Sequence, residues 1–309
     1  MWQRSFDSRT QAASPRTCAS IRTFLSRSLT SVRAASASGG AGISSGGRDK
    51  DNTPVTSDEI VPGDQSGGAT TSHTIVVPAL QLLLAAVGPD ADFETYERAA
   101  LEDNALAKDT IGSRRRTFRY LRELYILRDD AVLFRALRDL WHDDRTGQPL
   151  LAGLCALARD PVFRASSSAI FDSNPGDEIT SHELAHTVGE VFPGSYSAET
   201  LAKIGRNTAS SWEQTGHLEA IARTEKIRKR AVCTPSTMAY ALLLGHLEGV
   251  SGLALFGTIW ARSLDQPRGQ LMNLAAIASQ RSLIDFRHSG GVTDVGFSEL
   301  LRPVAGHLL

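Results

Sequence analysis

Two sets of residues have types and spacing that could do chemistry, and the first matches a zinc-hydrolase motif. Residues 182–186 read His-Glu-Leu-Ala-His, which fits the pattern H-E-x-x-H. On a helix, the two histidines lie one turn apart and can chelate zinc, while the glutamate activates the bound water. A third ligand is needed, and the longer form of the motif would have a histidine where this chain has Phe192.

The second set is a cluster of arginines in one short segment. Its members are Arg114, Arg115, Arg116, Arg119 and Arg122, opposed locally only by Glu123. At about 100° per residue, Arg115, Arg119 and Arg122 share one face of a helix. Arg114 to Arg116 stand in its first turn, where the helix dipole disfavours cations unless an anion neutralises them. This cluster favours a polyanion partner, and its alternative is a solvated helix face.

Another basic cluster falls where a winged helix would place its β-hairpin. Its members are Lys226, Arg228, Lys229 and Arg230. They follow two predicted helices, 199–205 and 208–215, and lie in a predicted hairpin of strands 219–224 and 226–232. In a DNA-binding winged helix, one helix enters the major groove and basic side chains position the phosphates. Winged helices also serve as protein-interaction modules, so the pattern leaves both uses open.

The elements that position these residues are predicted to be mainly helical. From Pro78 onward, apolar residues recur at spacings of three and four, which is the helical period. Besides the two helices above, the predicted helices span residues 80–87, 93–107, 114–127, 130–139, 149–158, 237–247, 253–264 and 269–279. A second winged-helix pattern consists of a helix over 270–281 followed by a hairpin over 284–296. The expected fold is a helical bundle with helix-turn-helix and winged-helix units and short hairpin wings.

Composition predicts four regions. Residues 1–73 are expected to form a disordered basic, low-complexity tail, because Gly, Ser, Thr and Asp dominate its second half and bury little apolar surface. Its Arg-rich, acid-poor start also fits a targeting segment. A helical domain is predicted over 74–194, in which the arginine helix, preceded by a short helix and the turn at residues 110–113, is helix-turn-helix-like. A winged-helix-like unit is predicted over 195–233. The C-terminal helical region, 234–309, carries the second hairpin.

Overall composition excludes several classes of protein. The 309 residues are 41% hydrophobic and 22% charged, with a formal net charge of −1. This balance is globular and argues against indiscriminate binding of nucleic acid, although not against local basic patches. No apolar run approaches the roughly 18 residues of a membrane span. Cys18, Cys155 and Cys233 are odd in number and far apart, which supports neither a disulfide framework nor a zinc knuckle.

Two stretches resemble the BrxA family of BREX bacteriophage-defence systems. The first is residues 102–108, Glu-Asp-Asn-Ala-Leu-Ala-Lys, with Thr110, the Arg114–Arg116 helix and Tyr120-Leu121-Arg122; the second is residues 197–204, Ser-Ala-Glu-Thr-Leu-Ala-Lys-Ile, running on to Gly216-His217-Leu218. Residues 149–160 also fit the helix between them. The resemblance covers about 74–232. It implies a mostly helical, cytoplasmic protein without known catalysis, and it places the arginine cluster in the family's basic helix.

The sequence therefore predicts a non-enzymatic accessory protein of a phage-defence system. Its expected partners are double-stranded DNA and other subunits of that system, with no membrane and no cofactor. Two alternatives stay open: a zinc-dependent hydrolase that uses His182, Glu183 and His186, and a scaffold whose winged helices dock other proteins.

Overall fold

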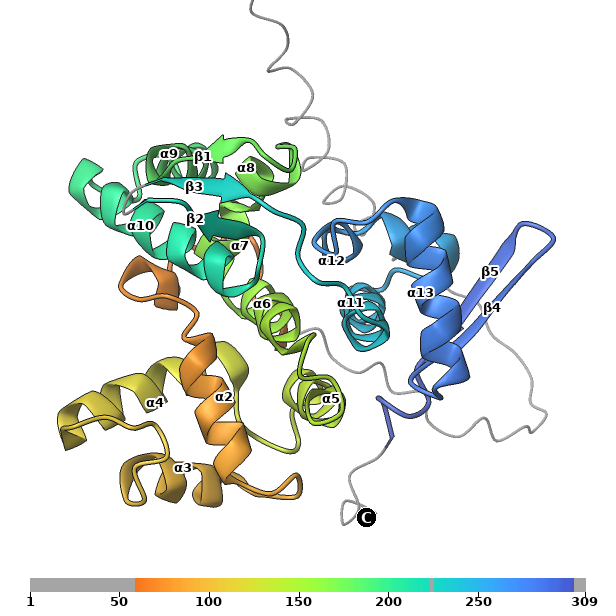
Figure 1. Cartoon of the computed structure of the whole chain (residues 1–309), viewed down its shortest axis with the longest axis horizontal. Coiled ribbons are helices and arrows are strands. Elements are labelled where there is room, and N and C mark those ends of the chain that lie inside the picture. The colour runs from red at the N-terminus through yellow and green to blue at the C-terminus, as the bar shows by residue number, and fades with distance from the viewer. Residues whose placement is uncertain (1–58, 223–224, 303–309) are drawn as a thin grey trace, which may run out of the picture. The chain divides into compact units, whose positions relative to one another are not determined.

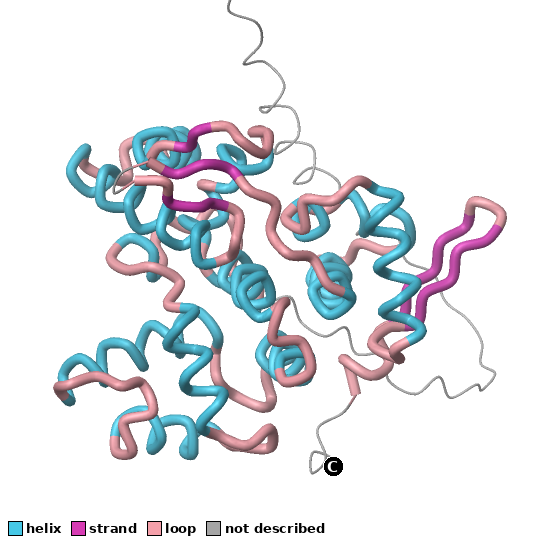
Figure 2. Tube along the Cα trace, in the orientation of Figure 1, coloured by secondary structure: helices cyan, strands magenta, loops and turns pink. Residues whose placement is uncertain are grey.

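This computed structural model describes residues 59–222 and 225–302 of the chain. They form a mainly helical fold with two small antiparallel sheets, as predicted (Figures 1 and 2). The helices of the first half are α2 (Val77–Ala86), α3 (Phe93–Leu101), α4 (Ile111–Tyr125), α5 (Val132–Trp141) and α6 (Gln148–Arg159), preceded by the 3-10 helix η2 (Ala69–Thr71). No helix of the described residues is long and apolar enough to cross a membrane.

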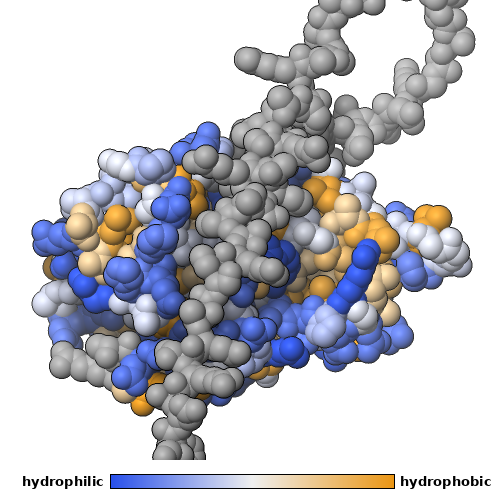
Figure 3. Space-filling view, turned by 90° about the horizontal axis from the view of Figure 1, so that it is seen from above, coloured by the Kyte–Doolittle hydropathy of each residue, from blue (hydrophilic) through white to orange (hydrophobic). Residues whose placement is uncertain are grey.

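The second half contains both sheets. It continues through α7 (Pro161–Ala165), α8 (Ser167–Phe171), β1 (Glu178–Ile179), α9 (Ser181–Val191), α10 (Ala198–Gln214), β2 (Leu218–Ala220) and β3 (Lys226–Arg228). The last elements are α11 (Pro235–Leu247), the 3-10 helix η3 (Gly252–Gly257), α12 (Ile259–Arg262), α13 (Arg268–Gln280), β4 (Asp285–Ser289) and β5 (Val292–Gly296). Figure 3 shows hydrophilic side chains interspersed with apolar ones on the visible surface.

The core centres on α6 and α11, which are buried on nearly all sides. In α6, every residue from Leu150 to Ala158 is buried, and in α11 every residue from Ser236 to Gly245 is buried. A helix without a polar stripe must be surrounded by other elements. Accordingly, α2, α4, α5, α7 and α10 pack around α6, while α5, α6, α12 and α13 pack around α11.

The first winged-helix unit differs from its prediction in its helices. Residues 198–214 form the single helix α10 rather than two helices, because Gly205 does not break the helix. Instead, Gly205 is where α10 approaches α9: a Cβ there would lie 2.0 Å from the backbone oxygen of Ser181. The helix-turn-helix is therefore α9–α10. The sheet has the order β1-β3-β2, so β2 and β3 form the predicted hairpin, with β1 beside it.

The C-terminal unit has the same order of elements. The predicted helix over 253–264 is divided into η3 and α12, and the α12–α13 pair is followed by the predicted hairpin, β4–β5. The hairpin packs against η3 and α13 and projects from the body in Figure 1. In the first half, the predicted helix 93–107 ends at Leu101, because Asn104 and Ala107 take left-handed backbone conformations with φ of 56° and 50°.

Part of the predicted tail belongs to the folded body. Residues 1–58 lie outside the described residues, but Ile60 and Thr70 are buried. The Glu59 carboxylate accepts hydrogen bonds from the backbone N–H groups of Val132 and Leu133 at 2.8 and 2.7 Å. These contacts hold the segment from Glu59 to Thr70 against the folded body despite its polar composition. The boundary predicted at residue 195 separates α9 from α10. Because these two helices pack closely together, they belong to the same part of the fold.

Candidate nucleic-acid interface

Four of the five arginines of α4 are exposed on the surface of the protein. These are Arg115, Arg116, Arg119 and Arg122. Among the described residues, none of the four forms an ion pair with a carboxylate. Arg119 lies over the Tyr120 ring, 5.1 Å from its centroid, and Arg122 lies 6.0 Å from the centroid of the Phe93 ring. These stacking contacts hold the guanidinium groups near the helix while leaving their charge available to an anion.

Arg114 has a different role, because its side chain binds the backbone that precedes α4. Its Nε donates to the Lys108 carbonyl at 3.2 Å, and its Nη1 donates to the Leu101 carbonyl at 3.1 Å. These bonds fix the connection between α3 and α4, where the chain takes its left-handed turns. Of the predicted DNA-binding arginines, Arg114 is therefore the one that positions the helix.

We expect Arg114→Ala to lower the free energy of unfolding by about 1–2 kcal/mol, because two carbonyls lose a charged donor. Arg115→Ala, one residue away and exposed, is expected to change it by less than about 0.5 kcal/mol. Denaturant unfolding of the two variants measures the difference. Equal effects would contradict the positioning role of Arg114.

Residues 69–76 connect α4 to α10, the second helix of the α9–α10 pair. On one side, the His73 and Tyr120 rings lie 4.5 Å apart, and the Ser72 and Tyr120 hydroxyls lie 3.4 Å apart. On the other side, Asn207 Nδ2 donates to the Thr70 carbonyl at 3.0 Å. The arginine face of α4 and the exposed face of α10 thus flank one segment, and both helices begin on the left of Figure 1.

The electrostatics of this segment reflect the nearby cations. Burial lowers the pKa of His73, and the charges of Lys108 and Arg116 lower it further. A hydrogen bond with Ser72 lowers the pKa of Tyr120, and Arg119 and Arg116 add to this shift. The main causes are burial for His73 and the Ser72 hydrogen bond for Tyr120, and the nearby cations add to both pKa shifts in the same direction, against the protonated imidazole and toward the phenolate.

Lys203 and Arg206 are exposed cations of α10 that the sequence analysis missed. Lys203 lies one turn before Asn207, on the stripe of α10 that continues to Ser211. The sequence signal that could have identified them is their spacing of three residues, which places both on one side of a helix, away from the buried positions. The first turn of α10 also contains the exposed Glu199, so the charge of this face is mixed.

The wing cations are engaged within the protein. Lys226 pairs with Glu213, and Lys229 pairs with Glu219 at 3.1 Å. Arg228 is 1% exposed, so the structure removes it from the candidate DNA contacts. Arg230 is exposed and has no ion pair among the described residues. Three of the four predicted wing cations are therefore paired with carboxylates of the same protein.

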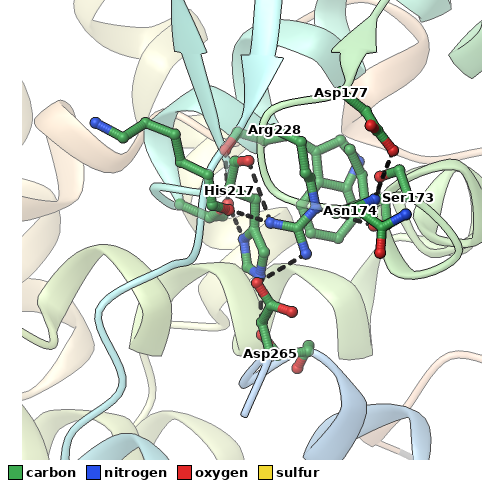
Figure 4. Close-up of polar contacts among 11 residues, drawn as sticks. Ser173, Asn174, Asp177, His217, Arg228 and Asp265 are labelled. Atoms are coloured by element: carbon green, nitrogen blue, oxygen red, sulfur yellow. Dashed lines mark hydrogen bonds and ion pairs between the residues drawn. The ribbon is translucent and has the colours of Figure 1, made fainter.

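Arg228 instead joins the two winged-helix units (Figure 4). Its guanidinium bonds the Asp265 carboxylate at 2.9 Å and the Ile170 carbonyl at 3.0 Å. Burial lowers the pKa of Arg228, whereas Asp265 raises it. Beside it, the buried His217 bonds the Ser263 carbonyl through Nε2 at 2.8 Å. Ser263 and Asp265 belong to the turn between α12 and α13, so this polar cluster fixes the C-terminal unit to the first one.

The H-E-x-x-H motif lies on α9 but does not form a metal centre. The Glu183 carboxylate accepts hydrogen bonds from the backbone N–H and the hydroxyl of Thr180, at 2.7 and 2.9 Å, and so completes a capping box. His182 and His186 line an open depression of about 690 Å³, which Asp172 and Asp177 also line. Within the described ranges, no group of three or more His, Cys, Asp or Glu residues is placed to hold a metal ion. The residues of this motif therefore do not fit a zinc ion.

Comparisons of this chain with known proteins find only distant structural similarity. No protein-family model matches the chain, and no curated protein matches it. Among solved structures, one described as "SspB crystal structure" has a TM-score of 0.48 and 13% identity, covering 75% of this chain and 84% of that chain. Another, "Magnesium ion-bound SspB crystal structure", has a TM-score of 0.47 and 12% identity, covering 75% and 86%.

Proposed function

We propose that this protein binds double-stranded DNA, and that it does so without catalysing a reaction on it. The observation that supports this proposal is the exposed arginine face of α4, whose cations have no carboxylate partner among the described residues. The first turn of a helix disfavours cations. Phosphate oxygens supply the missing negative charge and match the planar geometry of guanidinium groups.

The surroundings of α4 support duplex DNA as the source of these phosphates. α10 is the second helix of a helix-turn-helix, the element that enters the major groove in proteins of this architecture. The segment 69–76 holds α10 beside α4. In this arrangement, Arg115, Arg116 and Arg119 contact the backbone of the duplex, and Lys203 and Arg206 approach the groove. The net charge of −1 makes the binding depend on these local surfaces rather than on overall attraction.

The setting that we propose for this binding is bacteriophage defence, with other subunits of the defence system as partners. It rests only on the resemblance of residues 74–232 to the BrxA family. Genes for a methyltransferase, an ATPase and a phosphatase-like protein beside the gene of this chain would support it. Unrelated neighbouring genes would count against the setting but not against DNA binding.

We expect the affinity for a duplex of arbitrary sequence to fall linearly with salt concentration on a log–log plot. Each phosphate contact contributes about 0.9 to the slope. Combining Arg115→Ala, Arg116→Ala and Arg119→Ala should therefore reduce the slope by about 2.7 and weaken binding at low salt by at least about 10-fold. Fluorescence anisotropy with a labelled duplex at several salt concentrations measures both quantities.

The control for this experiment removes charge elsewhere. Arg128 and Arg145 are exposed and lie in connections outside α4 and α10, so Arg128→Ala with Arg145→Ala should change the slope by less than one. An unchanged slope in the α4 variant, or no binding of the unaltered protein at low salt, would overturn the proposed function.

A further inference from the structure

An open pocket of about 520 Å³ lies at the C-terminal end of α5, which is in the lower middle of Figure 1. Its wall comes from four segments: the connection after α2, the end of α5, the residues that follow α13 and those that follow β5. Among the described residues that line it, none belongs to α4 or α10. Its volume lies in the range of about 300–1,000 Å³ that is usual for small-molecule sites. The pocket is therefore a candidate site separate from the proposed DNA contacts.

The wall of this pocket contains a buried arginine whose charge has no carboxylate partner among the described residues. Arg138 lines the pocket and is 7% exposed. Its Nε and Nη1 are inaccessible to water and have no hydrogen-bond partner in the described part of the chain, which leaves Nη2 as the guanidinium nitrogen outside this buried set. The carboxylate of the next residue, Asp139, pairs instead with Arg302 at 2.9 Å. A buried charge without a counter-charge is costly, so Arg138 calls for an anion that the described residues do not supply.

The other groups near Arg138 do not neutralise it. Its guanidinium carbon lies 6.0 Å from the centroid of the Phe134 ring. The buried Tyr96 hydroxyl has a raised pKa because of its burial, although the charge of Arg138 opposes this shift. Tyr96 is therefore a neutral phenol near pH 7. One turn before Arg138, Arg135 is a second cation that is 7% exposed, so the inner wall of the pocket is positive.

The outer part of the same pocket carries the opposite charge. Asp90 and Glu299 line it, are exposed, and have no ion pair among the described residues. A dianion such as a phosphate monoester would meet these two carboxylates on its way to Arg138, and like charges repel. A ligand with one carboxylate and one ammonium group complements both parts of the pocket.

The remaining wall is largely apolar. Leu140 and Leu300 are buried residues that line the pocket, and the half-buried Leu283 lies beside them. Small-molecule sites typically combine such an apolar wall with a few polar groups that fix the orientation of the ligand. The leucines offer a surface to an apolar side chain, while the charged residues select the group at its end.

We propose that this pocket binds a free amino acid with an apolar side chain. The ligand carboxylate accepts a charge-assisted hydrogen bond from the Arg138 guanidinium, and the ligand ammonium group faces Asp90 and Glu299. The apolar side chain packs on the leucines of the wall. The observation that carries the inference is the buried guanidinium of Arg138, which lines the pocket and has no counter-charge among the described residues. The inference is independent of DNA binding.

The test is isothermal titration calorimetry of the full-length protein with leucine, isoleucine, valine, methionine and phenylalanine as probes. At least one of them is expected to bind saturably. The amide of that amino acid lacks the carboxylate, and its N-acetyl derivative lacks the ammonium group. Each derivative should bind at least about 10-fold more weakly, because each loses a hydrogen bond between charged groups. Inorganic phosphate should bind more weakly than the amino acid.

Variants of the pocket make the result specific. Arg138→Met keeps the length of the side chain and removes its charge, so it should weaken binding of the amino acid by at least about 10-fold. Arg135→Met is the matched control, because Arg135 is equally buried on the same helix but does not line the pocket; it should leave the affinity unchanged. Thermal unfolding verifies that each variant is folded. Replacing an unpaired buried charge by an apolar side chain of similar volume is not expected to destabilise the protein.

An exposed residue provides a second variant that does not depend on the core. Glu299→Gln should weaken binding of the amino acid and leave the weaker binding of its N-acetyl derivative unchanged. Absence of binding by all five amino acids at millimolar concentration would overturn the inference. Equal binding of the amino acid and its amide, tighter binding of phosphate, or full affinity in a folded Arg138→Met variant would overturn it as well. None of these results bears on the proposed DNA binding.

Discussion

Replacing Gly205 by alanine is expected to lower the free energy of unfolding by about 3 kcal/mol or more. The added Cβ would lie 2.0 Å from the Ser181 backbone oxygen and 2.9 Å from the Ala185 Cβ. Neither group is the flexible end of a long side chain, so α9 and α10 must move apart. Forcing a methyl group into a closely packed interior costs about 1–3 kcal/mol, and more where backbone has to shift. Denaturant unfolding gives the value directly.

Gly189→Ala is the matched control, because Gly189 lies on α9 and faces α10. There, a Cβ would lie 3.4 Å from Leu201 Cδ1, an ordinary contact with a side chain that can adjust. Alanine also favours the helical backbone over glycine by about 1 kcal/mol. We therefore expect equal or slightly raised stability. A similar loss of stability in both variants would show that the close approach of α9 is not the reason why position 205 requires glycine.

The second large effect is a pair of opposing pH dependences from two buried groups. Burial lowers the pKa of His217 to about 3, so His217 destabilises the fold as the pH falls from about 6.5 toward 3, where the unfolded chain binds the proton more tightly. Burial raises the pKa of Asp160 to about 6, although the N–H groups of Phe163 and Thr70 oppose this shift. Asp160 therefore stabilises the fold as the pH falls from about 6 to 4. Between pH 4 and 6 the two contributions offset each other.

Single variants should separate the two contributions. Relative to the unaltered protein, Asp160→Asn should lose about 3 kcal/mol of stability between pH 7 and pH 4, because the opposing His217 contribution remains alone. His217→Gln should gain about 3 kcal/mol over the same range. Chemical denaturation at several pH values measures these differences, in which the other titrating groups cancel. Slopes of the same sign in the two variants would contradict the assignment.

Most of the helices could be predicted because their apolar spacing is determined by local packing. α2, α5, α6, α11 and α13 lie within a few residues of their predicted bounds, and both hairpins occur where turn residues interrupt the helical period. The errors arise where tertiary contacts decide. Gly205 suggested a helix end, but its missing side chain serves the α9 contact. Glu59 belongs to a polar segment, yet it caps α5, more than seventy residues away.

The candidate interface could be predicted only in part. The exposure of Arg115, Arg116, Arg119 and Arg122 agrees with the helical spacing in the sequence. The helical spacing does not indicate that the Arg114 side chain binds the backbone carbonyls of the preceding connection. The wing cations were misjudged because two of their partners come from other elements, Glu213 from α10 and Asp265 from the turn before α13. For the histidine motif, Thr180 followed by Glu183 is itself a capping-box pattern, which could have indicated the structural use of this glutamate.

The burial of α11 on nearly all sides bears on how the chain can unfold. One flank of α11 packs on α5 and α6, and another packs on α12 and α13, so its apolar surface contributes to both halves of the core. Unfolding either half alone would remove the elements that pack on one flank of α11 and expose its apolar side chains to water. The described body should for this reason melt as one cooperative block, and a ligand that tightens one end raises the melting temperature of the other end with it.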